Sequence, residues 1–319
     1  MNLKLTISSP SRLHFGFVEL DKEASRNFGS LGLTISKFKN IIQIKESKNF
    51  QVIAKKQEIR SKIKGIFKKF SKKFLIKPFK IEVHETAPLH IGLGSGTQLS
   101  LAVGLLISEY NNLKLSFEDI VKISERGLRS GIGIESFRTG GFIVDCGKGK
   151  NTSIPPVFFK SKWPSNWKII LILDNSFKGL SGNEEKKQFI KISKVDSNIS
   201  RNNSKTLLMD IIPSIIEGDF NNFCEGIQKI QDNMSKVFYN NKRKFASKTI
   251  QEVFNFIRKK NIKGYGQSSW GPSGFILCKD EKKRNELLID LNKYMKYSNI
   301  NNLTMEKIEG RNSGYIKTK

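Results

Sequence analysis

The sequence is poor in cysteine, histidine and acidic residues. Its 319 residues include three cysteines (Cys146, Cys224 and Cys278), three histidines, and 29 Asp and Glu against 56 Lys and Arg. The cysteines are widely spaced and form no CxxC pair, which excludes a disulfide framework and a thiolate zinc site. Such sparse cysteine is typical of the reducing cytoplasm.

Long apolar runs are also missing. No run approaches the roughly 18 apolar residues that a membrane-spanning helix needs, and residues 1–15 lack the basic-then-apolar order of a signal peptide. We therefore expect a cytoplasmic protein with no membrane partner. With 38% hydrophobic residues the chain can build a core, and its length predicts two domains, or one large one, at about 150 residues a domain.

The formal net charge of +27 comes mainly from lysine, with 45 Lys against 11 Arg. The densest stretch, residues 55–80, has eleven basic residues and the single acid Glu58. Apolar residues recur in it at three- and four-residue steps, namely Ile59, Ile63, Ile66, Phe67, Phe70 and Phe74. This pattern predicts a helix with one buried stripe and a solvated lysine face. A surface that contacts a nucleic-acid backbone is the alternative.

Strand and helix patterns follow one another along the chain. Strand patterns cover residues 3–7, 41–44, 51–54, 79–83, 142–145, 168–174 and 273–278, with one or two more at the C-terminus. Helical patterns cover residues 98–110, 117–126, 207–237, 249–260 and 281–297. A segment rich in Pro and Trp at 155–167 predicts a boundary between domains 1–163 and 164–319. The polar stretch 175–205 is expected to be a mobile loop with weak helix.

Glycines occupy every second position in residues 92–96 of the segment Gly-Leu-Gly-Ser-Gly-Thr, just before the predicted helix 98–110. Backbone N–H groups can face a ligand there without an intervening Cβ, and the positive end of the helix points to the same place. Phosphate binds to such a geometry. The segment is neither a Walker motif, which needs a Lys-Ser/Thr pair, nor a Rossmann motif, because Thr97 replaces the third glycine. A tight turn with no ligand is the alternative.

Two arginines, a hydroxyl and a carboxylate lie among glycines in residues 129–141. They are Arg129, Ser130, Glu135 and Arg138. Guanidinium groups suit bidentate capture of phosphate or carboxylate, beside a group able to hold a metal or a proton. The alternative is a glycine-bent hairpin with a surface Arg–Glu pair.

Two further glycine-rich segments contain polar side chains. Residues 9–16 follow the first predicted strand and include Arg12 and His14. Residues 268–274, Ser-Ser-Trp-Gly-Pro-Ser-Gly, precede a strand, and Trp270 can pack on a neighbouring segment or a ligand. His14 and His90 both lie in glycine-rich segments, and the alternative to catalysis is a hydrogen-bonded structural role.

Together these motifs resemble the GHMP kinase superfamily. SPSRLHFG, PLHIGLGSGTQ and SSWGPSG match its three motif positions, and its members bind nucleotide phosphates on the central glycine loop. Within it, RNFGSLGLTI, RSGIGIESFRTGGFIVDCG and GYGQSSWGPSGF are similar to archaeal-type β-ribofuranosylaminobenzene 5′-phosphate synthases. The resemblance implies an α+β fold with two domains. The N-terminal βαβ domain contains the glycine phosphate loop, the C-terminal domain is ferredoxin-like, and the site lies between them.

Two positions differ from the kinases of this superfamily. The kinases have a catalytic aspartate in the pattern SG-x-D, and Gly133 stands at that position here. Gly96 replaces a serine that is common in their glycine loop. Glu135 could act as the base instead, so an ATP-dependent small-molecule kinase is an alternative. A basic nucleic-acid-binding protein is a third, but with no recognisable nucleic-acid motif we expect no such partner.

The resemblance implies a decarboxylating phosphoribosyltransferase. It would condense 5-phosphoribosyl 1-diphosphate with 4-aminobenzoate or 4-hydroxybenzoate in methanopterin-type cofactor biosynthesis, releasing CO2 and diphosphate. Small-molecule substrates, a Mg2+ cofactor and a homodimer are implied in the same way. The site would hold three anionic groups by positioning and electrostatics. Because the ring carbon loses a carboxylate and not a proton, a strong general base is less necessary.

These motifs and this resemblance supply the predicted site residues. The catalytic candidates are Arg12, His14, Arg129, Ser130 and Glu135. The phosphate- and substrate-binding candidates are Arg26, His90, Gly92, Leu93, Gly94, Ser95, Gly96, Thr97, Arg138, Ser269, Trp270 and Gly271. The candidate metal ligands are Glu135 and Asp145.

Overall fold

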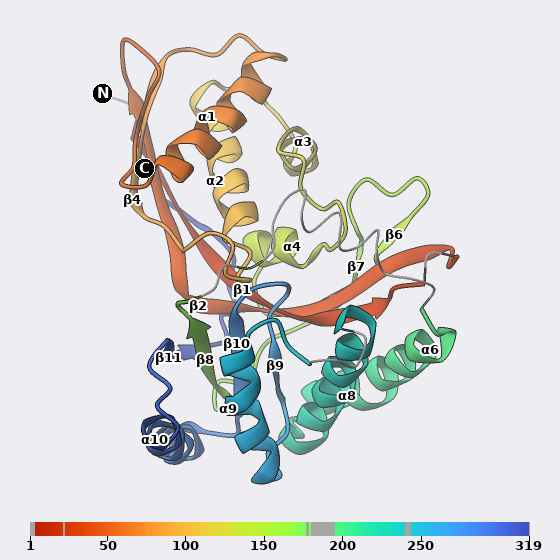
Figure 1. Cartoon of the computed structure of the whole chain (residues 1–319). Coiled ribbons are helices and arrows are strands. Elements are labelled where there is room, and N and C mark those ends of the chain that lie inside the picture. Colours follow the sequence, from red (N-terminus) through yellow and green to blue (C-terminus); the bar gives the residue numbers. More distant parts are fainter. Residues whose placement is uncertain (1–3, 22, 177–178, 180–194, 240–243, 319) are drawn as a thin grey trace.

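A large sheet forms the upper part of the molecule in Figure 1. The computed structural model describes residues 4–21, 23–176, 179, 195–239 and 244–318. The eight strands follow the order β12-β1-β2-β4-β3, with β5 and β6 paired to β2 and β7 paired to β5. They are β1 (Lys4–Glu19), β2 (Arg26–Glu46), β3 (Gln51–Ile53), β4 (Phe79–Glu85), β5 (Phe142–Asp145), β6 (Lys148–Gly149), β7 (Val157–Ser161) and β12 (Ile316–Thr318).

Strands β1 and β2 are much longer than the sequence predicts. They pair antiparallel from Lys4↔Lys45 to Glu19↔Phe28, with register shifts between Ser9 and Ser11 and between His14 and Gly16. The prediction that residues 9–16 follow the first strand is therefore wrong, because they lie within β1. Proline lacks the N–H that a ladder needs, and the first shift coincides with Pro10, so the strand continues past it.

Four helices cover one face of the large sheet. They are α1 (Gln57–Ser71), α2 (Ser95–Tyr110), α3 (Phe117–Ile123) and α4 (Ile132–Arg138). The stripe predicted for residues 55–80 is confirmed, since Ile59, Ile63, Ile66 and Phe70 are buried on α1. Helix α2 is buried along most of its length and lies between α1 and the sheet strands β1 and β2 (Figure 1). The glycine-bent hairpin considered for residues 129–141 is wrong, because this segment forms α4.

A second sheet of four strands has the order β11-β8-β10-β9 and lies in the lower part of the molecule. Its strands are β8 (Lys168–Asp174), β9 (Tyr265–Gln267), β10 (Ser273–Cys278) and β11 (Leu303–Glu309). Helices α9 (Lys248–Lys259) and α10 (Glu281–Tyr297) pack on one face of it. This βαββαβ order is ferredoxin-like, as expected.

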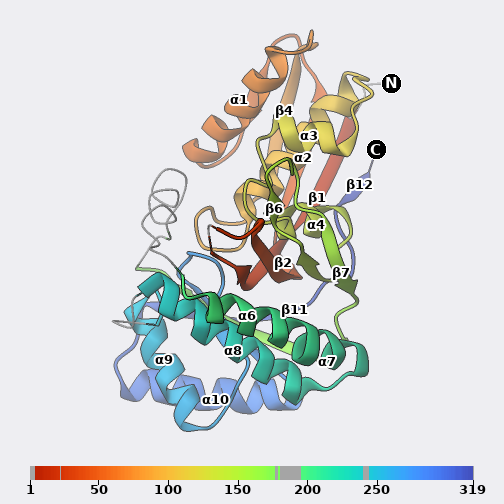
Figure 2. The ribbon, with the colours of Figure 1, turned by 90° about the vertical axis from the view of Figure 1, so that its right-hand side faces the viewer.

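The two sheets share a hydrophobic core. Alternate residues of β8 face opposite sides, with Ile170 and Ile172 toward α9 and α10, and Ile169 and Leu171 toward the core shared with β1 and β2. Because both faces are buried, β8 is a continuous apolar run. The shared core also takes side chains from a helical series of α6 (Ser197–Thr206), the π-helical turn η1 (Leu207–Ile211), α7 (Ile212–Glu217) and α8 (Phe220–Tyr239), seen together in Figure 2.

Two sequence predictions, the domain boundary at 163/164 and the loop 175–205, are not settled by the described residues. The boundary between 163 and 164 stays a prediction; it falls between β7 and β8, and β12 returns from the end of the chain to pair with β1. Most of the stretch 175–205, expected to be a mobile loop, lies outside the described residues, and its last part forms α6. Within the described part of the chain, no helix combines the length and apolar character that crossing a membrane requires.

Candidate active site

The glycine segment forms a sharp turn into the buried helix α2. Gly92 and Gly94 have φ values of 83° and 72°, in the left-handed region that favours glycine. Gly94 is the N-cap of α2, whose first residue is Ser95. The backbone N–H of Arg12 donates to the Leu93 carbonyl oxygen at 3.0 Å and so fixes the backbone of Leu93. The predicted loop-to-helix geometry is confirmed.

The segment 268–274 packs directly on this glycine turn. The Ser268 hydroxyl donates to the Gly92 carbonyl oxygen at 2.8 Å and accepts from the His14 backbone N–H at 3.0 Å. A Cβ at Gly271 would lie 2.3 Å from the Gly92 nitrogen, so only glycine permits this approach. Three motifs that are far apart in the sequence thus meet at one place, between the two sheets.

A cavity of ≈ 480 Å³ opens at this meeting point. It is lined by thirteen of the predicted site residues, namely Arg12, His14, His90, Gly92, Gly94, Ser95, Gly96, Thr97, Arg129, Ser130, Ser269, Trp270 and Gly271. Leu93 lies beneath it, in the shared core. The cationic side chains of the cavity and the N-terminus of α2 suit an anionic ligand.

His14 is a neutral imidazole at the wall of this cavity. The side chain is only 3% exposed. Burial, followed by the positive charges of Arg12 and Arg129, holds the pKa of His14 well below its usual value. Its Nε2 atom is buried and has no hydrogen-bond partner among the described residues. A neutral ring with an unsatisfied nitrogen can bind a polar group of a substrate.

Glu135 and Arg138 do not line this cavity. The Glu135 carboxylate accepts from Arg138 Nε at 2.9 Å and from the Thr139 hydroxyl at 2.9 Å, and both residues line a separate cavity of ≈ 290 Å³. Three-residue spacing places them on one side of α4, whereas Gly133 faces Thr97 of α2. Glu135 and Arg138 thus lie apart from the glycine turn, and their predicted catalytic and substrate-binding roles stay predictions.

Arg26 and Asp145 are also engaged elsewhere. Arg26 donates to the carbonyl oxygens of Cys146 and Gly147, each at 3.0 Å. Asp145 is buried and accepts from the N–H groups of Gly131 and Gly147, each at 2.8 Å, and from two serine hydroxyls. Burial raises the pKa of its carboxyl, and these hydrogen bonds oppose the rise. Asp145 therefore orients the start of α4, and neither residue lines the cavity.

The cavity was also compared with what a metal site requires. Among the residues that the structure describes, no group of three or more His, Cys, Asp or Glu side chains could hold a metal ion. The candidate ligands Glu135 and Asp145 lie outside the lining of this cavity, so their role as metal ligands stays a prediction.

Comparison with known proteins agrees with this arrangement. Residues 61–139 match the family of GHMP kinases N terminal domain. The chain is 31% identical to the beta-ribofuranosylphenol 5′-phosphate synthase of Methanothermobacter thermautotrophicus over 89% of this chain and 92% of the relative. It is 30% identical to the synthase of the same name from Methanocaldococcus jannaschii, over 84% and 88%.

The chain belongs to the beta-ribofuranosylphenol 5′-phosphate synthase family. It is therefore an enzyme, a transferase of the GHMP kinase superfamily. Solved structures confirm the fold: mevalonate diphosphate decarboxylase from Staphylococcus aureus has a TM-score of 0.71 at 14% identity, covering 100% of this chain and 99% of its own. Homoserine kinase from Cytophaga hutchinsonii has a TM-score of 0.64 at 14% identity, covering 99% and 97%.

The sequence did not single out two cations of this synthase cavity. Lys62 comes from α1, and Arg126 follows α3. Burial and the charge of Arg126 lower the pKa of Lys62 to about 8, against the opposing effect of Glu58. A signal existed in the helical pattern, since Lys62 lies beside the buried stripe of Ile59 and Ile63, at the edge of the lysine face.

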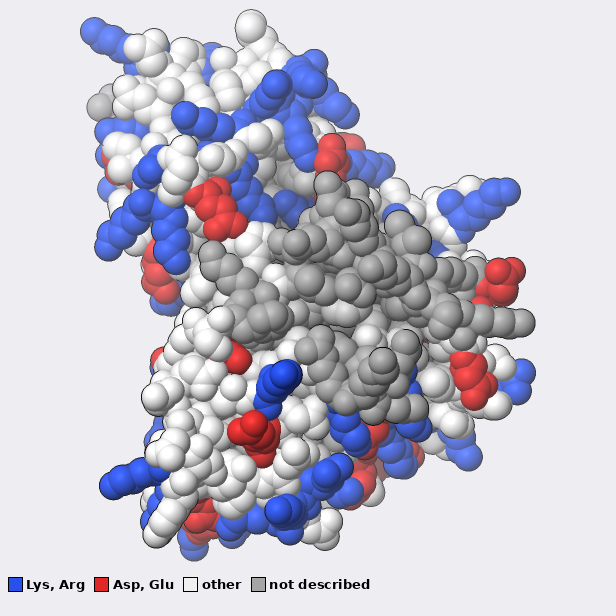
Figure 3. Space-filling model, in the orientation of Figure 1, with Lys and Arg blue, Asp and Glu red and all other residues white. Residues whose placement is uncertain are grey.

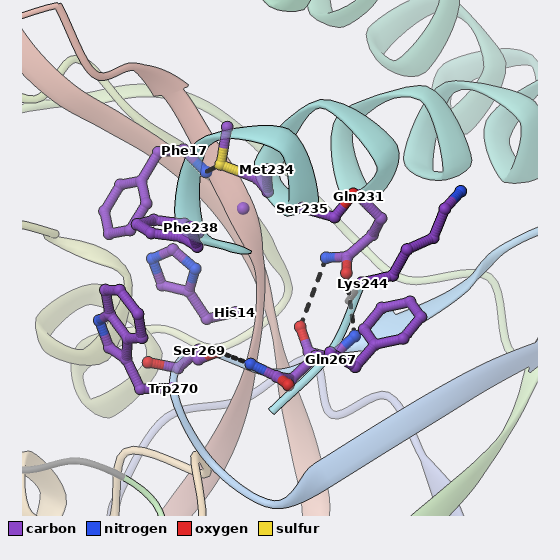
Figure 4. A pocket seen from close by; sticks show the side chains of 12 residues that line it. His14, Phe17, Gln231, Met234, Ser235, Phe238, Lys244, Gln267, Ser269 and Trp270 are labelled. Carbon is purple, nitrogen blue, oxygen red and sulfur yellow. Dashed lines mark hydrogen bonds between the residues drawn. The ribbon is translucent and has the colours of Figure 1, made fainter. Parts of the chain in front are cut away.

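An aromatic hollow adjoins the cavity of the synthase. Figure 4 shows His14 with Phe17, Phe238 and Trp270 on the left of the view, and the side chains of Gln231 and Gln267 to their right. The ring centroids of Phe238 and Trp270 are 4.4 Å apart, and those of His14 and Phe17 are 4.6 Å apart. The hollow itself is only ≈ 40 Å³, but His14, Phe17 and Trp270 also line the larger cavity. Aromatic rings thus form one end of an otherwise cationic site.

Proposed function

We propose that this synthase joins 5-phosphoribosyl 1-diphosphate to a 4-substituted benzoate and releases CO2 and diphosphate, in methanopterin-type cofactor biosynthesis. One observation supports this most: a cationic cavity on the glycine loop has Gly133 where a kinase has its base. The curated relatives are named for a phenol product. We therefore propose 4-hydroxybenzoate as the first acceptor to test and 4-aminobenzoate as the second.

The reaction needs positioned charge more than a base. The bond from the ribose C1 to the diphosphate breaks, leaving an oxocarbenium-like centre, and the ring carbon that bears the carboxylate attacks it. The bond to the carboxylate then breaks, its electrons restore the aromatic ring, and CO2 leaves. No carbon loses a proton. Arg12 and Arg129 would stabilise the departing anion, and the N-terminus of α2 would contribute its positive dipole.

The aromatic end of the cavity is the proposed place of the acceptor. Trp270 and Phe17 would pack against the benzoate ring. The unpartnered Nε2 of His14 would hydrogen-bond the 4-hydroxyl or 4-amino group, because the neutral imidazole can donate or accept. With Nε2 as the acceptor, such a bond would strengthen the electron donation that makes the ring carbon nucleophilic.

We also propose that Mg2+ enters with the diphosphate. This ion prefers oxygen ligands and commonly binds through substrate phosphates while keeping several waters. A cage of protein carboxylates is not required for such binding. We also propose a cytoplasmic location, from the sparse cysteine, and a homodimer, from the family resemblance.

A labelled-CO2 assay tests the function. Purified protein is incubated with 5-phosphoribosyl 1-diphosphate and carboxyl-labelled 4-hydroxybenzoate or 4-aminobenzoate, with and without Mg2+, and released label is counted. We expect release that depends on both substrates, and none when ATP replaces the ribosyl donor. No release with either benzoate would overturn the proposal.

A further inference from the structure

The cavity contains two pairs of cations, one beside Gly94 of the glycine turn and one beside Gly96. Arg12 lies beside Gly94, where a Cβ would be 3.0 Å from its Nε atom, and its charge and that of Arg129 both act on His14. Lys62 lies beside Gly96, where a Cβ would be 2.5 Å from its Nζ atom. The charge of Arg126 acts on Lys62 in turn.

Arg126 is held against the first turns of α2. Its Nη2 donates to the Ser100 hydroxyl at 2.8 Å, and that hydroxyl donates to the Gly96 carbonyl oxygen at 2.8 Å. Its Nε atom is buried with no partner among the described residues. Burial lowers the pKa of this guanidinium, so part of its charge is poorly solvated.

Lys62 has no direct counter-ion in the described part of the chain. Neither a hydrogen bond nor an ion pair joins its ammonium group to another described residue. The nearby carboxylates are committed elsewhere: Glu58 pairs with His90 at 2.7 Å, and Glu125 pairs with Lys69 at 2.6 Å. The charges of Glu58 and Glu125 offset those of Lys62 and Arg126 only in part, because each carboxylate is paired with another side chain. Two partly buried cations held together in this way are unfavourable until an anion binds.

We propose that Lys62 and Arg126 form a second phosphate subsite at the start of α2, separate from the pair Arg12 and Arg129. The identity of its ligand rests on the proposed function, because 5-phosphoribosyl 1-diphosphate has a phosphate group at each end. A donor that spans the glycine turn would place one end at each cation pair. The subsite accepts either the diphosphate or the 5-phosphate.

Calorimetric titration with two fragments of the donor tests this subsite. Inorganic diphosphate and ribose 5-phosphate are titrated separately into wild type, Lys62→Met and Lys64→Met. Lys64 is an exposed lysine of the same helix, so its variant controls for the loss of one charge. We expect Lys62→Met to weaken one fragment by roughly ten- to a hundredfold, as expected for a lost charge-assisted hydrogen bond. The affinity for the other fragment should change no more in Lys62→Met than it does in Lys64→Met.

The fragment that is affected names the ligand of the subsite. Weaker ribose 5-phosphate binding assigns it to the 5-phosphate end and leaves the diphosphate to Arg12 and Arg129. Weaker diphosphate binding assigns it to the leaving group, and the role proposed for Arg12 and Arg129 then passes to Lys62 and Arg126. No loss for either fragment, or an equal loss for both, would overturn the proposal. Lys62→Arg should restore most of the affinity. Failure of the proposed function is separate, since it would abolish CO2 release without changing these affinities.

The affinity for that fragment should also depend on pH. Lys62, whose pKa lies at about 8, loses its proton between pH 7 and pH 9 in the free protein. The charged groups that face it are Arg126, Glu58 with its partner His90, and Glu125. Wild-type affinity should fall over this range more steeply than that of Lys62→Arg, which stays charged. Equal pH profiles would contradict a role for the Lys62 ammonium.

Discussion

At the scale of single residues, position and not charge alone separates the arginines. Arg12 and Arg129 lie at the cavity beside a buried, neutral His14. Arg26 and Arg138, which come from equally glycine-rich sequence, hold backbone carbonyls or a buried carboxylate outside the cavity. Substitutions should therefore divide the arginines into two classes, one that affects turnover and one that affects stability.

Arg129→Ala should lower kcat/KM by at least about a hundredfold, because a cation that stabilises the departing diphosphate is lost. The melting temperature should change little, since Arg129 is only partly buried. Steady-state CO2 release and a thermal melt measure the two effects. Near-normal turnover would show that this guanidinium does not act on the substrate.

Arg138→Ala is the contrasting variant. The described partners that then remain for the Glu135 carboxylate, a residue 4% exposed, are Thr139 and the more distant Lys160. We expect a loss of about 2 kcal/mol in the free energy of unfolding, with kcat preserved. Urea denaturation beside the CO2 assay measures both, and a large fall in kcat at unchanged stability would place Arg138 in the reaction after all.

His14 should make the stability of the protein depend on pH. Its pKa is lowered in the folded state, so below about 6.5 the unfolded chain binds a proton that the folded protein does not. The stabilisation that comes from the neutral His14 is therefore complete above about pH 6.5. As pH falls below this value, the free energy of unfolding decreases by at most about 1.4 kcal/mol per pH unit. Urea unfolding at pH 7, 6 and 5 should show a smaller decline for His14→Gln than for wild type. Parallel declines would contradict this role.

At the scale of elements, the glycine turn and α2 create the anion site together. The left-handed Gly94 starts the helix, and Gly92 allows the segment 268–274 to pack against it. Helix α1 then packs on α2 and brings Lys62 to the same end. The turn therefore places the positive end of the α2 dipole and the cationic side chains at the same site.

Gly94→Val should weaken diphosphate binding by at least about tenfold. Valine is strained at φ 72°, and its Cβ would lie 3.0 Å from Arg12 Nε, so the guanidinium must move. Gly65→Ala on α1 is the matched control, because nothing lies within 4 Å of the new Cβ. That change should raise the free energy of unfolding by about 0.5–1 kcal/mol and leave binding alone. Unaltered binding by Gly94→Val would exclude the turn from the site.

At the scale of the whole molecule, the charge is dispersed and one hydrophobic core cluster is shared by the two sheets. Figure 3 shows Lys and Arg over both the upper and lower parts of one face, with Asp and Glu among them. The core shared by the two sheets lies behind the cavity and fixes the distance between the three motifs. The end of the chain contributes as well, since Tyr315 stacks on Phe137 of α4 with ring centroids 4.7 Å apart.

Tyr315→Ala should therefore weaken the packing of α4. In the wild type the Tyr315 backbone N–H donates to the Phe137 carbonyl oxygen at 2.7 Å. The variant keeps this hydrogen bond and loses the contact between the rings. We expect the free energy of unfolding to fall by about 2 kcal/mol, because this ring is only partly buried. Urea denaturation measures it. A change below about 0.5 kcal/mol would show that the C-terminal segment does not support α4.

Periodicity and motif were enough to predict α1, α2, α10, the strands β8 and β10, and the family, because each depends on local spacing or on short exact motifs. The lengths of β1 and β2 were not predictable in the same way. A strand continues where a partner strand supplies its hydrogen bonds, and in β1 a register shift accommodates Pro10.

By itself, the sequence determined that this chain is a glycine-loop protein of the synthase family without a kinase aspartate at Gly133. Only the tertiary structure decided which polar side chains share the cavity. Glu135 turns away because α4 is a helix with one face toward α2, and Lys62 arrives from a distant helix because α1 packs beside that same α2. Side-chain direction and long-range packing are not encoded in residue spacing alone.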